Sequence, residues 1–205
     1  MSSDSASTAP PQHPVAEVWS LAWPTVITMT SFTVMQFADK LMVGQVGPTE
    51  VAAQGNGGIW SFALVSAGMG IVTVVNTYVS QNLGAGRPER GSVYPWAALW
   101  LSLIAWAVVM VPWALAIPWI FAFMHGDAET PRLVALETEY AQFLLVGSLF
   151  VLVSRGFTHY FFGLHRPKIV TISTIFANII NIVGNYILIF GEDGIPGFLP
   201  GIPGV

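Results

Sequence analysis

Long stretches without any charged residue place the strongest constraint on how this chain folds. Residues 18–38, 51–86, 91–126 and 169–191 contain no Asp, Glu, Lys or Arg. About 18 such residues are enough for a helix to cross the hydrocarbon core of a bilayer. Charged residues make up 9% of the 205-residue chain, against about 25% in a typical soluble domain. The sequence therefore predicts an all-α, polytopic transmembrane helix bundle.

Polar and Pro/Gly-rich segments divide the chain into five expected membrane spans, at about residues 15–43, 49–81, 91–124, 133–163 and 168–191. Residues 1–14 are polar, Pro-rich and without Lys or Arg, which favours a disordered tail over a cleaved signal peptide. Residues 192–205 are expected to form a loop after the fifth span. Small residues let helices approach closely in membranes. The second span is rich in them: Gly55, Gly57, Gly58, Ser66, Gly68 and Gly70.

The basic residues of the expected loops predict how the chain is oriented. The loops after spans two and four contain Arg87, Arg90, Arg166 and Lys168, whereas the other loops are acidic and contain only Arg132. Cytoplasmic loops carry the excess of Lys and Arg. We therefore expect a multi-pass protein of the plasma (inner) membrane. Its N-terminus would be cytoplasmic and residues 192–205 would be extracytoplasmic.

Several classes of function have no support in the sequence. The chain has no cysteine, which excludes disulfides and thiolate metal sites. It has no metal-ligand spacing such as HExxH and no nucleophile elbow, and no long basic cluster of the kind that binds nucleic acid. We therefore expect no enzyme activity, no bound cofactor, no dedicated metal site and no nucleic-acid partner.

Asp39 is the candidate functional residue that chemistry alone identifies. An ionisable side chain inside a membrane span indicates a functional site by default. Gln36 lies three residues earlier, where it can share a hydrogen-bond network with Asp39. Two structural alternatives remain, since Asp39 can also cap the helix near the outer interface or pair with Lys40. Adjacent helix residues point about 100° apart, which makes the second alternative geometrically poor.

Three asparagines in the fifth span form a second candidate feature. Asn178, Asn181 and Asn185 are spaced so that they share one face of a helix. At about 1.5 Å per residue, Asp39, Asn181 and Asn185 all lie at the middle or in the outer half of the membrane. Amides of this kind also serve as contacts between helices, worth about 0.6 kcal/mol each. Facing Asp39, the stripe is more typical of one wall of a proton or cation site.

Several segments together resemble the multidrug and toxic compound extrusion (MATE) transporters. They are LAWP at 21–24, FADKLMVGQVG at 37–47, SQNLGAG at 80–86 and NIVGNYILIFG at 181–191. The resemblance covers residues 15–205 and rests on the order of the segments and on the spacing from Pro24 to Asp39.

The resemblance implies a fold, an activity and roles for individual residues. It implies two lobes of six helices that export cationic or amphipathic compounds against an inward flow of H⁺ or Na⁺. Asp39 matches the carboxylate that binds the coupling cation, and Asn181 and Asn185 match two polar positions of the same cavity. A Na⁺ site at these three residues is one form of this coupling. Asn178 has no matching position, so its role rests on helix geometry alone.

Five spans correspond to five-sixths of one such lobe, so the resemblance implies that a sixth helix and a second lobe are missing. We therefore expect part of a secondary antiporter, without assigning an oligomeric state. One alternative is a truncated helix bundle that transports nothing. Another is a lipid-linked sugar flippase of the same superfamily, whose cavities usually carry more cationic residues than the single Arg155 found here.

Overall fold

The computed structural model describes residues 14–125 and 131–191, and within them the chain is helical without any strand. Its elements are α1 (Pro14–Val46), α2 (Pro48–Val72), α3 (Val74–Gly84), α4 (Pro88–Gly91), α5 (Tyr94–Ala105), the π-helical turn η1 (Trp106–Met110), α6 (Val111–His125), α7 (Pro131–Gly163) and α8 (Pro167–Phe190). The predicted all-α class is confirmed. The predicted N-terminal tail and the predicted loop at 192–205 lie outside the described residues, apart from Pro14, which begins α1.

Four of the described helical segments are long and apolar enough to cross a membrane: Pro48–Gly84, Glu89–His125, Pro131–Gly163 and Pro167–Phe190. Helix α1, which corresponds to the first expected span, has 33 residues but is not among them. Its uncharged stretch contains many hydroxyl and amide side chains, including Thr28, Ser31 and Gln36, which lower its hydropathy. Helix α1 is therefore long enough to span a bilayer, but it has no 18-residue stretch as apolar as those in the other four segments.

Two of these segments contain local breaks in the α-helix. Thr73 separates α2 from α3, although its backbone N–H still bonds to the carbonyl oxygen of Met69 at 3.1 Å. The π-helical turn η1 lies directly before Val111 and Pro112. Because proline has no N–H, it cannot form the bond that would continue a regular helix at this point. The Trp106 side chain, at the start of η1, faces α7. Its Nε1 donates a hydrogen bond to the carbonyl oxygen of Val146 at 2.8 Å.

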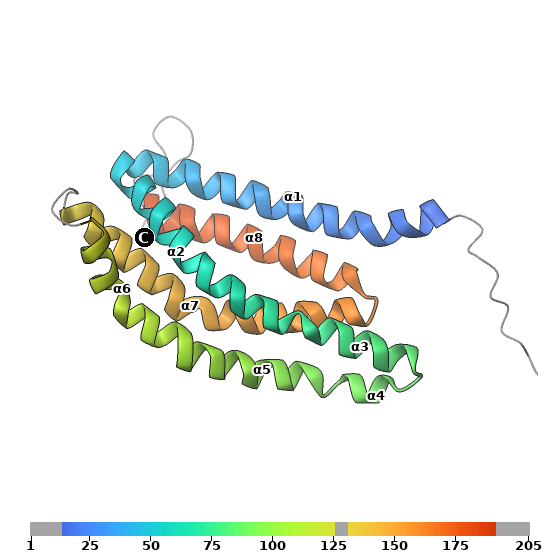
Figure 1. The fold of residues 1–205 in the computed structure, drawn as a ribbon. Helices are drawn as coiled ribbons and strands as arrows, with labels where there is room; N and C mark the ends of the chain where they lie inside the picture. Colours follow the sequence, from blue (N-terminus) through green and yellow to red (C-terminus); the bar gives the residue numbers. More distant parts are fainter. Residues whose placement is uncertain (1–13, 126–130, 192–205) are drawn as a thin grey trace, which may run out of the picture.

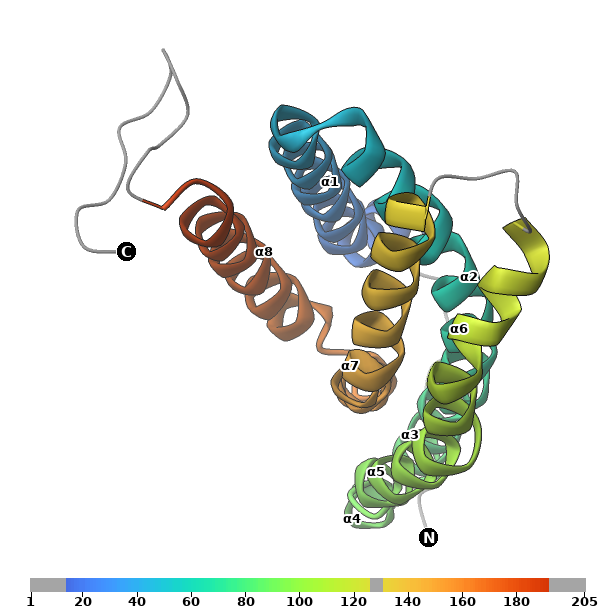
Figure 2. The same cartoon turned by 90° about the vertical axis from the view of Figure 1, so that its left-hand side faces the viewer.

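The helices form two groups on either side of α7 (Figures 1 and 2). Helices α1 and α8, the first and last of the described chain, run side by side and contact each other far more than they contact the rest. Helices α2, α3, α5 and α6 pack against α7 from the other side. Few contacts join α8 to α7 or α1 to α2. The first and last described helices therefore form a pair that is loosely attached to the remaining bundle.

Glycines allow the closest approach of α7 to its neighbours. A side chain at Gly57 would lie 2.9 Å from the backbone oxygen of Glu137, and one at Gly68 would lie 3.0 Å from the Leu152 side chain. Two of the small residues expected to permit such contacts therefore do so. At Gly55 and Gly70, by contrast, an added Cβ would meet nothing within 4 Å.

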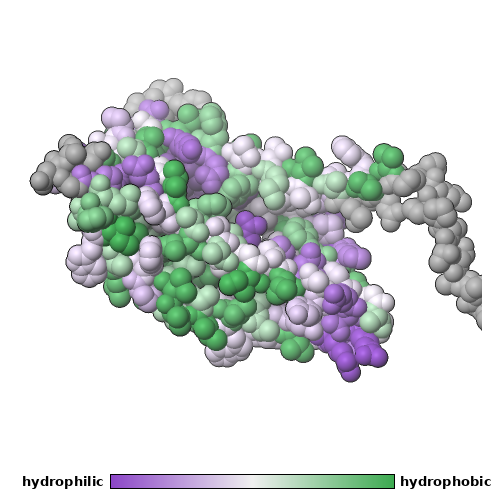
Figure 3. Space-filling model, viewed as in Figure 1, coloured by the Kyte–Doolittle hydropathy of each residue, from purple (hydrophilic) through white to green (hydrophobic). Residues whose placement is uncertain are grey.

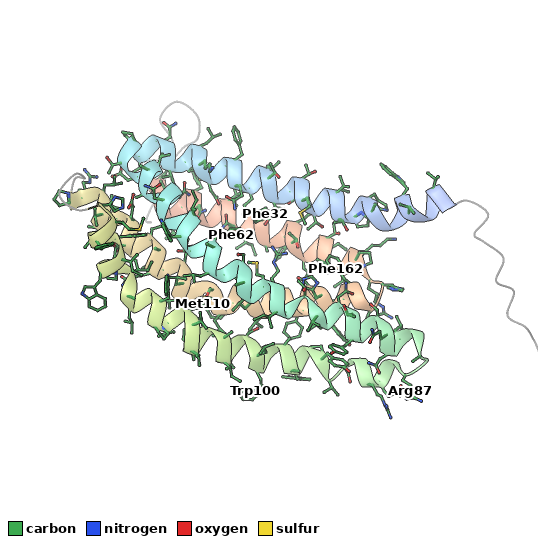
Figure 4. The ribbon with its side chains drawn as sticks, viewed as in Figure 1. Phe32, Phe62, Arg87, Trp100, Met110 and Phe162 are labelled. Atoms are coloured by element: carbon green, nitrogen blue, oxygen red, sulfur yellow. The ribbon has the colours of Figure 1, made fainter. Side chains whose placement is uncertain are left out.

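The outer surface is largely apolar, as lipid contact requires. The main core cluster lies between α2, α6 and α7 and includes Met110, Phe121 and Leu145. Trp100 points away from the bundle and is 64% exposed, whereas Met110 lies between helices and is 2% exposed (Figure 4). Figure 3 shows hydrophobic side chains over much of the α5–α6 surface, with hydrophilic side chains in the furrow between α1 and α2.

Candidate functional site

The structure brings Asp39 together with two of the three predicted asparagines. The Asn185 side-chain nitrogen Nδ2 donates to Asp39 Oδ1 at 2.8 Å and lies 3.3 Å from Asn181 Oδ1. Asp39 comes from α1, and both asparagines come from α8. Asn181 and Asn185 are four residues apart, the spacing at which helix side chains are neighbours. We call Asp39, Asn181 and Asn185 the acid–amide group.

The acid–amide group is closed by helix packing on one side and accessible on another. The side chains of Asp39 and Asn185 are partly buried, whereas Asn181 is exposed. The Asp39–Asn185 bond ties α1 to α8 near the end of α1 and away from its N-terminus. A carboxylate at this position keeps contact with a donor and is only partly enclosed by the described helices.

Tyr140 of α7 is a further member of this region that the sequence analysis missed. Its hydroxyl shares a hydrogen bond with Gln54 of α2 and lies within electrostatic range of Asp39. The Tyr140 ring also lies against α2, close to where a side chain at Gly57 or Gly58 would be. Tyr140 and Gln54 therefore present a polar edge of the α2–α7 pair toward the acid–amide group.

Asn178 and Gln36 are not part of the acid–amide group. Asn178 is 7% exposed and donates from Nδ2 to Ser31 Oγ at 2.8 Å. This bond joins α8 to α1 about two turns away from Asn185. The Gln36 side chain is exposed, and no described residue holds it near Asp39. Asn178 thus acts as a contact between two helices, the alternative that the sequence left open for these amides.

A third connection joins α1 to α8 at the proline within α1. Pro24 is fully buried. Its carbonyl oxygen lies 2.8 Å from the Thr28 hydroxyl and 3.0 Å from the Thr171 hydroxyl. The two hydroxyls are themselves 3.0 Å apart. The hydroxyls therefore hold α8 against α1 at Pro24, where a proline-containing helix bends most easily.

The chemistry of the acid–amide group suits a proton or a small hard cation. Asp39 offers carboxylate oxygens and Asn181 an amide oxygen, the ligand types that hard cations prefer. Asn185 presents its NH₂ group to both of these oxygens. A Na⁺ ion would need Asn185 to turn its own oxygen inward, whereas a proton on Asp39 needs no such change. Among residues 14–125 and 131–191, no three His, Cys, Asp or Glu side chains form a metal-binding cluster.

Arg155, the cation that bears on the flippase alternative, is exposed on α7 and has no carboxylate partner among the described residues. His159 lies one turn further along α7, and its Nδ1 is buried without a hydrogen-bond partner in the described part of the chain. Neither side chain belongs to the acid–amide group. In the described part of α7, Arg155 is thus a single exposed arginine without a cluster of cations around it.

The fold and the polar group within it define a multi-pass helical membrane protein. The model of the MatE family matches residues 24–187. The chain belongs to this family, and the resemblance to MATE transporters is thereby confirmed. Asp39, Asn181 and Asn185 all lie within the matched region.

Proteins with similar sequences come from several bacteria. The chain is 28% identical over 177 residues to "Probable multidrug resistance protein NorM" of Synechococcus sp., an alignment that covers 86% of this chain and 37% of that protein. It is 29% identical over 185 residues to "Multidrug resistance protein MdtK" of Klebsiella pneumoniae, with 88% and 39% covered. The chain therefore spans about two fifths of the length of these relatives.

A solved structure shares the fold. It is described as "Reverse polarity of binding pocket suggests different function of a MOP superfamily transporter from Pyrococcus furiosus Vc1 (DSM3638)". It matches with a TM-score of 0.72 and 26% identity, over 83% of this chain and 37% of that chain. The helix arrangement described above is therefore one that a MOP superfamily transporter adopts.

Proposed function

We propose that this chain contributes the cation-coupling site of a multidrug efflux antiporter, in which export is driven by inward movement of H⁺ or Na⁺. The observation that carries the proposal is the 2.8 Å bond between Asp39 Oδ1 and Asn185 Nδ2, which places an ionisable group between two membrane helices. The relatives support the substrate class, since their names describe multidrug resistance proteins. We propose cationic or amphipathic compounds as substrates.

The coupling follows from the charge of Asp39. As a carboxylate, Asp39 attracts a cationic compound and accepts the Asn185 hydrogen bond strongly, because hydrogen bonds to charged groups are the stronger ones. Binding of a proton or Na⁺ cancels this charge and weakens both interactions. The pair formed by α1 and α8 then changes its preferred arrangement, and the bend available at Pro24 gives α1 a place to move. Cation binding and drug release would thereby be linked.

We propose that the N-terminus is cytoplasmic and that residues 192–205 are extracytoplasmic, in the plasma (inner) membrane. The end of the bundle where α4 lies and α8 begins carries Arg87, Arg90, Arg166 and Lys168 (Figure 1). The start of α1 lies toward the same end. The excess of basic residues at cytoplasmic ends supports this orientation.

The proposal is tested by transport into liposomes that contain the purified chain and an acidic interior. A fluorescent quaternary-ammonium dye is added outside, because its permanent charge prevents it from distributing with the pH gradient by itself. We expect dye uptake with the wild-type chain, and uptake at the level of protein-free liposomes with Asp39→Asn. Glu139→Gln is the matched control, since Glu139 is an exposed carboxylate on α7. The same assay with a Na⁺ gradient in place of the proton gradient identifies the coupling ion.

Full uptake by Asp39→Asn would contradict the proposed coupling site. Equal background uptake by wild type and both variants would instead favour the alternative, a helix bundle that transports nothing without the remaining three fifths of the relatives' length. Uptake of an anionic lipid-linked sugar and not of the cationic dye would favour the flippase alternative. The exposed Arg155 is the reason for including this substrate in the assay.

A further inference from the structure

A second polar cluster lies where α2 and α6 meet α7. Glu137 of α7 has no exposed surface, although it is ionisable. Its Oε1 accepts a hydrogen bond from Asn56 Nδ2 of α2 at 2.7 Å, and its Oε2 lies 2.8 Å from His125 Nε2 of α6. We call Asn56, His125 and Glu137 the Glu137 cluster. Three different helices thus meet around one buried carboxyl group.

The contacts of Glu137 leave room for one more proton. The His125 ring approaches Oε2 at ion-pair distance but not along a hydrogen-bond direction, so Oε2 has no hydrogen bond from a described residue. A buried acceptor without a donor is costly. A proton carried either by the carboxyl group or by the imidazole would satisfy this contact. Asn56 can only donate its amide hydrogens to Oε1 and supplies no proton.

The charge of the Glu137 cluster depends on how many protons it holds. With one proton shared between His125 and Glu137 the pair is neutral overall, with two it is positive, and with none it is negative. The His125 side chain is 17% exposed and the Glu137 side chain is not exposed. Of the two ionisable members of the cluster, His125 is therefore the one with exposed surface, at the end of α6.

The Glu137 cluster is close to the acid–amide group without being part of it. Glu137 and Tyr140 are three residues apart on α7 and are therefore neighbours on the helix surface. A Cβ added at Gly57 would lie against both residues, and Gln54 of α2 bonds to Tyr140. Tyr140 in turn lies within electrostatic range of Asp39. Glu137 is thus linked to Asp39 through neighbouring residues of α2 and α7.

We propose that Asn56, His125 and Glu137 form a second proton-binding site, separate from the one at Asp39. The site takes a proton from water through the His125 ring and returns it by the same route, so no other reactant is needed. A charge gained there acts on Asp39 through the Tyr140–Gln54 pair. Proton binding at this site does not depend on the proposed transport function, and it is measured on the chain without a transport assay.

Other charged or titratable groups lie near this end of the described chain and must be distinguished from the site. Glu50 of α2 and Arg132 of α7 form a salt bridge with each other. Glu139 is exposed on α7, and Tyr140 bonds to Gln54. On α1 the corresponding groups are Asp39 and the exposed Lys40. Helix α6 contributes His125. Glu139 is the suitable control carboxyl because it lies two residues from Glu137 but outside the core.

The test is an infrared titration of the purified chain in lipid, which follows the C=O stretch of protonated carboxyl groups between pH 4 and 9. We expect a component of this band to disappear in Glu137→Gln and to remain in Glu139→Gln and in Asp39→Asn. Glutamine keeps the shape of the side chain and its oxygen can still accept from Asn56. Circular dichroism of each variant establishes that the helices are retained.

A second measurement keeps the proposal testable if Glu137→Gln does not fold. In the wild-type chain, NMR of the imidazole carbons reports the His125 ring, identified by its loss in His125→Gln. We expect the His125 signals and the Glu137 carboxyl band to change over the same pH interval. We also expect His125→Gln to change the pH interval over which the Glu137 carboxyl band appears. A carboxyl band that is identical in wild type and Glu137→Gln would overturn the proposal. So would a band that is unaffected by His125→Gln.

Discussion

Replacing Gly57 by alanine tests whether close packing of α2 against α7 positions the polar residues that these two helices bring together. The added Cβ would lie 2.9 Å from the backbone oxygen of Glu137 and 3.2 Å from Tyr140 Cδ1. The first of these atoms belongs to the backbone of a helix, so it cannot rotate away as a flexible side chain would. We expect α2 and α7 to be pushed apart at this point, with loss of the Asn56–Glu137 and Gln54–Tyr140 bonds.

The magnitude follows from a comparison with Gly55→Ala in the same helix. Both changes gain helix propensity, about 1 kcal/mol per Gly→Ala substitution. At Gly55 an added Cβ meets nothing within 4 Å, so only the gain applies. At Gly57 the overpacking cost is about 1–3 kcal/mol. The two variants should therefore differ by about 2 kcal/mol in free energy of unfolding, which is about a 30-fold change in the ratio of folded to unfolded protein.

Reversible unfolding of the purified chain in mixed micelles, at increasing mole fractions of a denaturing detergent, measures this difference. The helical signal and the fluorescence of the tryptophans provide two independent readings of the same transition. Gly58→Ala is a further control, because its Cβ would lie at an ordinary contact distance of 3.7 Å from Tyr140. If Gly57→Ala were as stable as Gly55→Ala, the reasoning that links this glycine to the α2–α7 contact would be refuted.

Three further substitutions address the pairing of α1 with α8. Asn178→Ala removes the bond to Ser31, and we expect it to cost about 0.6 kcal/mol, with an upper limit near 1.7 kcal/mol, by the same unfolding assay. Thr171→Val keeps the size of the side chain but removes the hydroxyl next to the Pro24 carbonyl. We expect it to lower the free energy of unfolding by a similar amount. Backbone hydrogen exchange around Pro24 should be faster in Thr171→Val than in Thr171→Ser. Gln36→Ala should leave both stability and dye uptake unchanged, since the side chain is exposed; a loss of uptake would show that Gln36 takes part in the acid–amide group.

The helical class followed from the sequence because the hydrophobic effect acts on long segments. Uncharged stretches of this length have few structures available other than membrane helices. Counting residues at a fixed rise predicted that Asp39, Asn181 and Asn185 lie at similar heights along their helices, and the structure does bring these three side chains together. Whether they bind the coupling ion stays a prediction.

Contacts that depend on tertiary packing did not follow from the sequence. Gln36 and Met42 lie at equal spacing on either side of Asp39 along α1, and the sequence does not show which flank is covered. In the structure Met42 is buried, whereas Gln36 is exposed. Tyr140 and Glu137 were missed because their partners come from α2 and α6. Glu137 has Thr138 and Glu139 beside it in the sequence, and only packing shows that Glu137 is buried whereas Glu139 is exposed.

The pairing of the first and last described helices has a consequence for biosynthesis. Helix α1 has no stretch as apolar as those of the other long helical segments, and its polar side chains find their partners on α8: Asp39 on Asn185, and Ser31 on Asn178. Helix α8 leaves the ribosome well after α1. We therefore expect α1 to remain accessible from water, or close to the insertion machinery, until α8 has been made. Stable insertion of the first helix would thus depend on synthesis of the last described one.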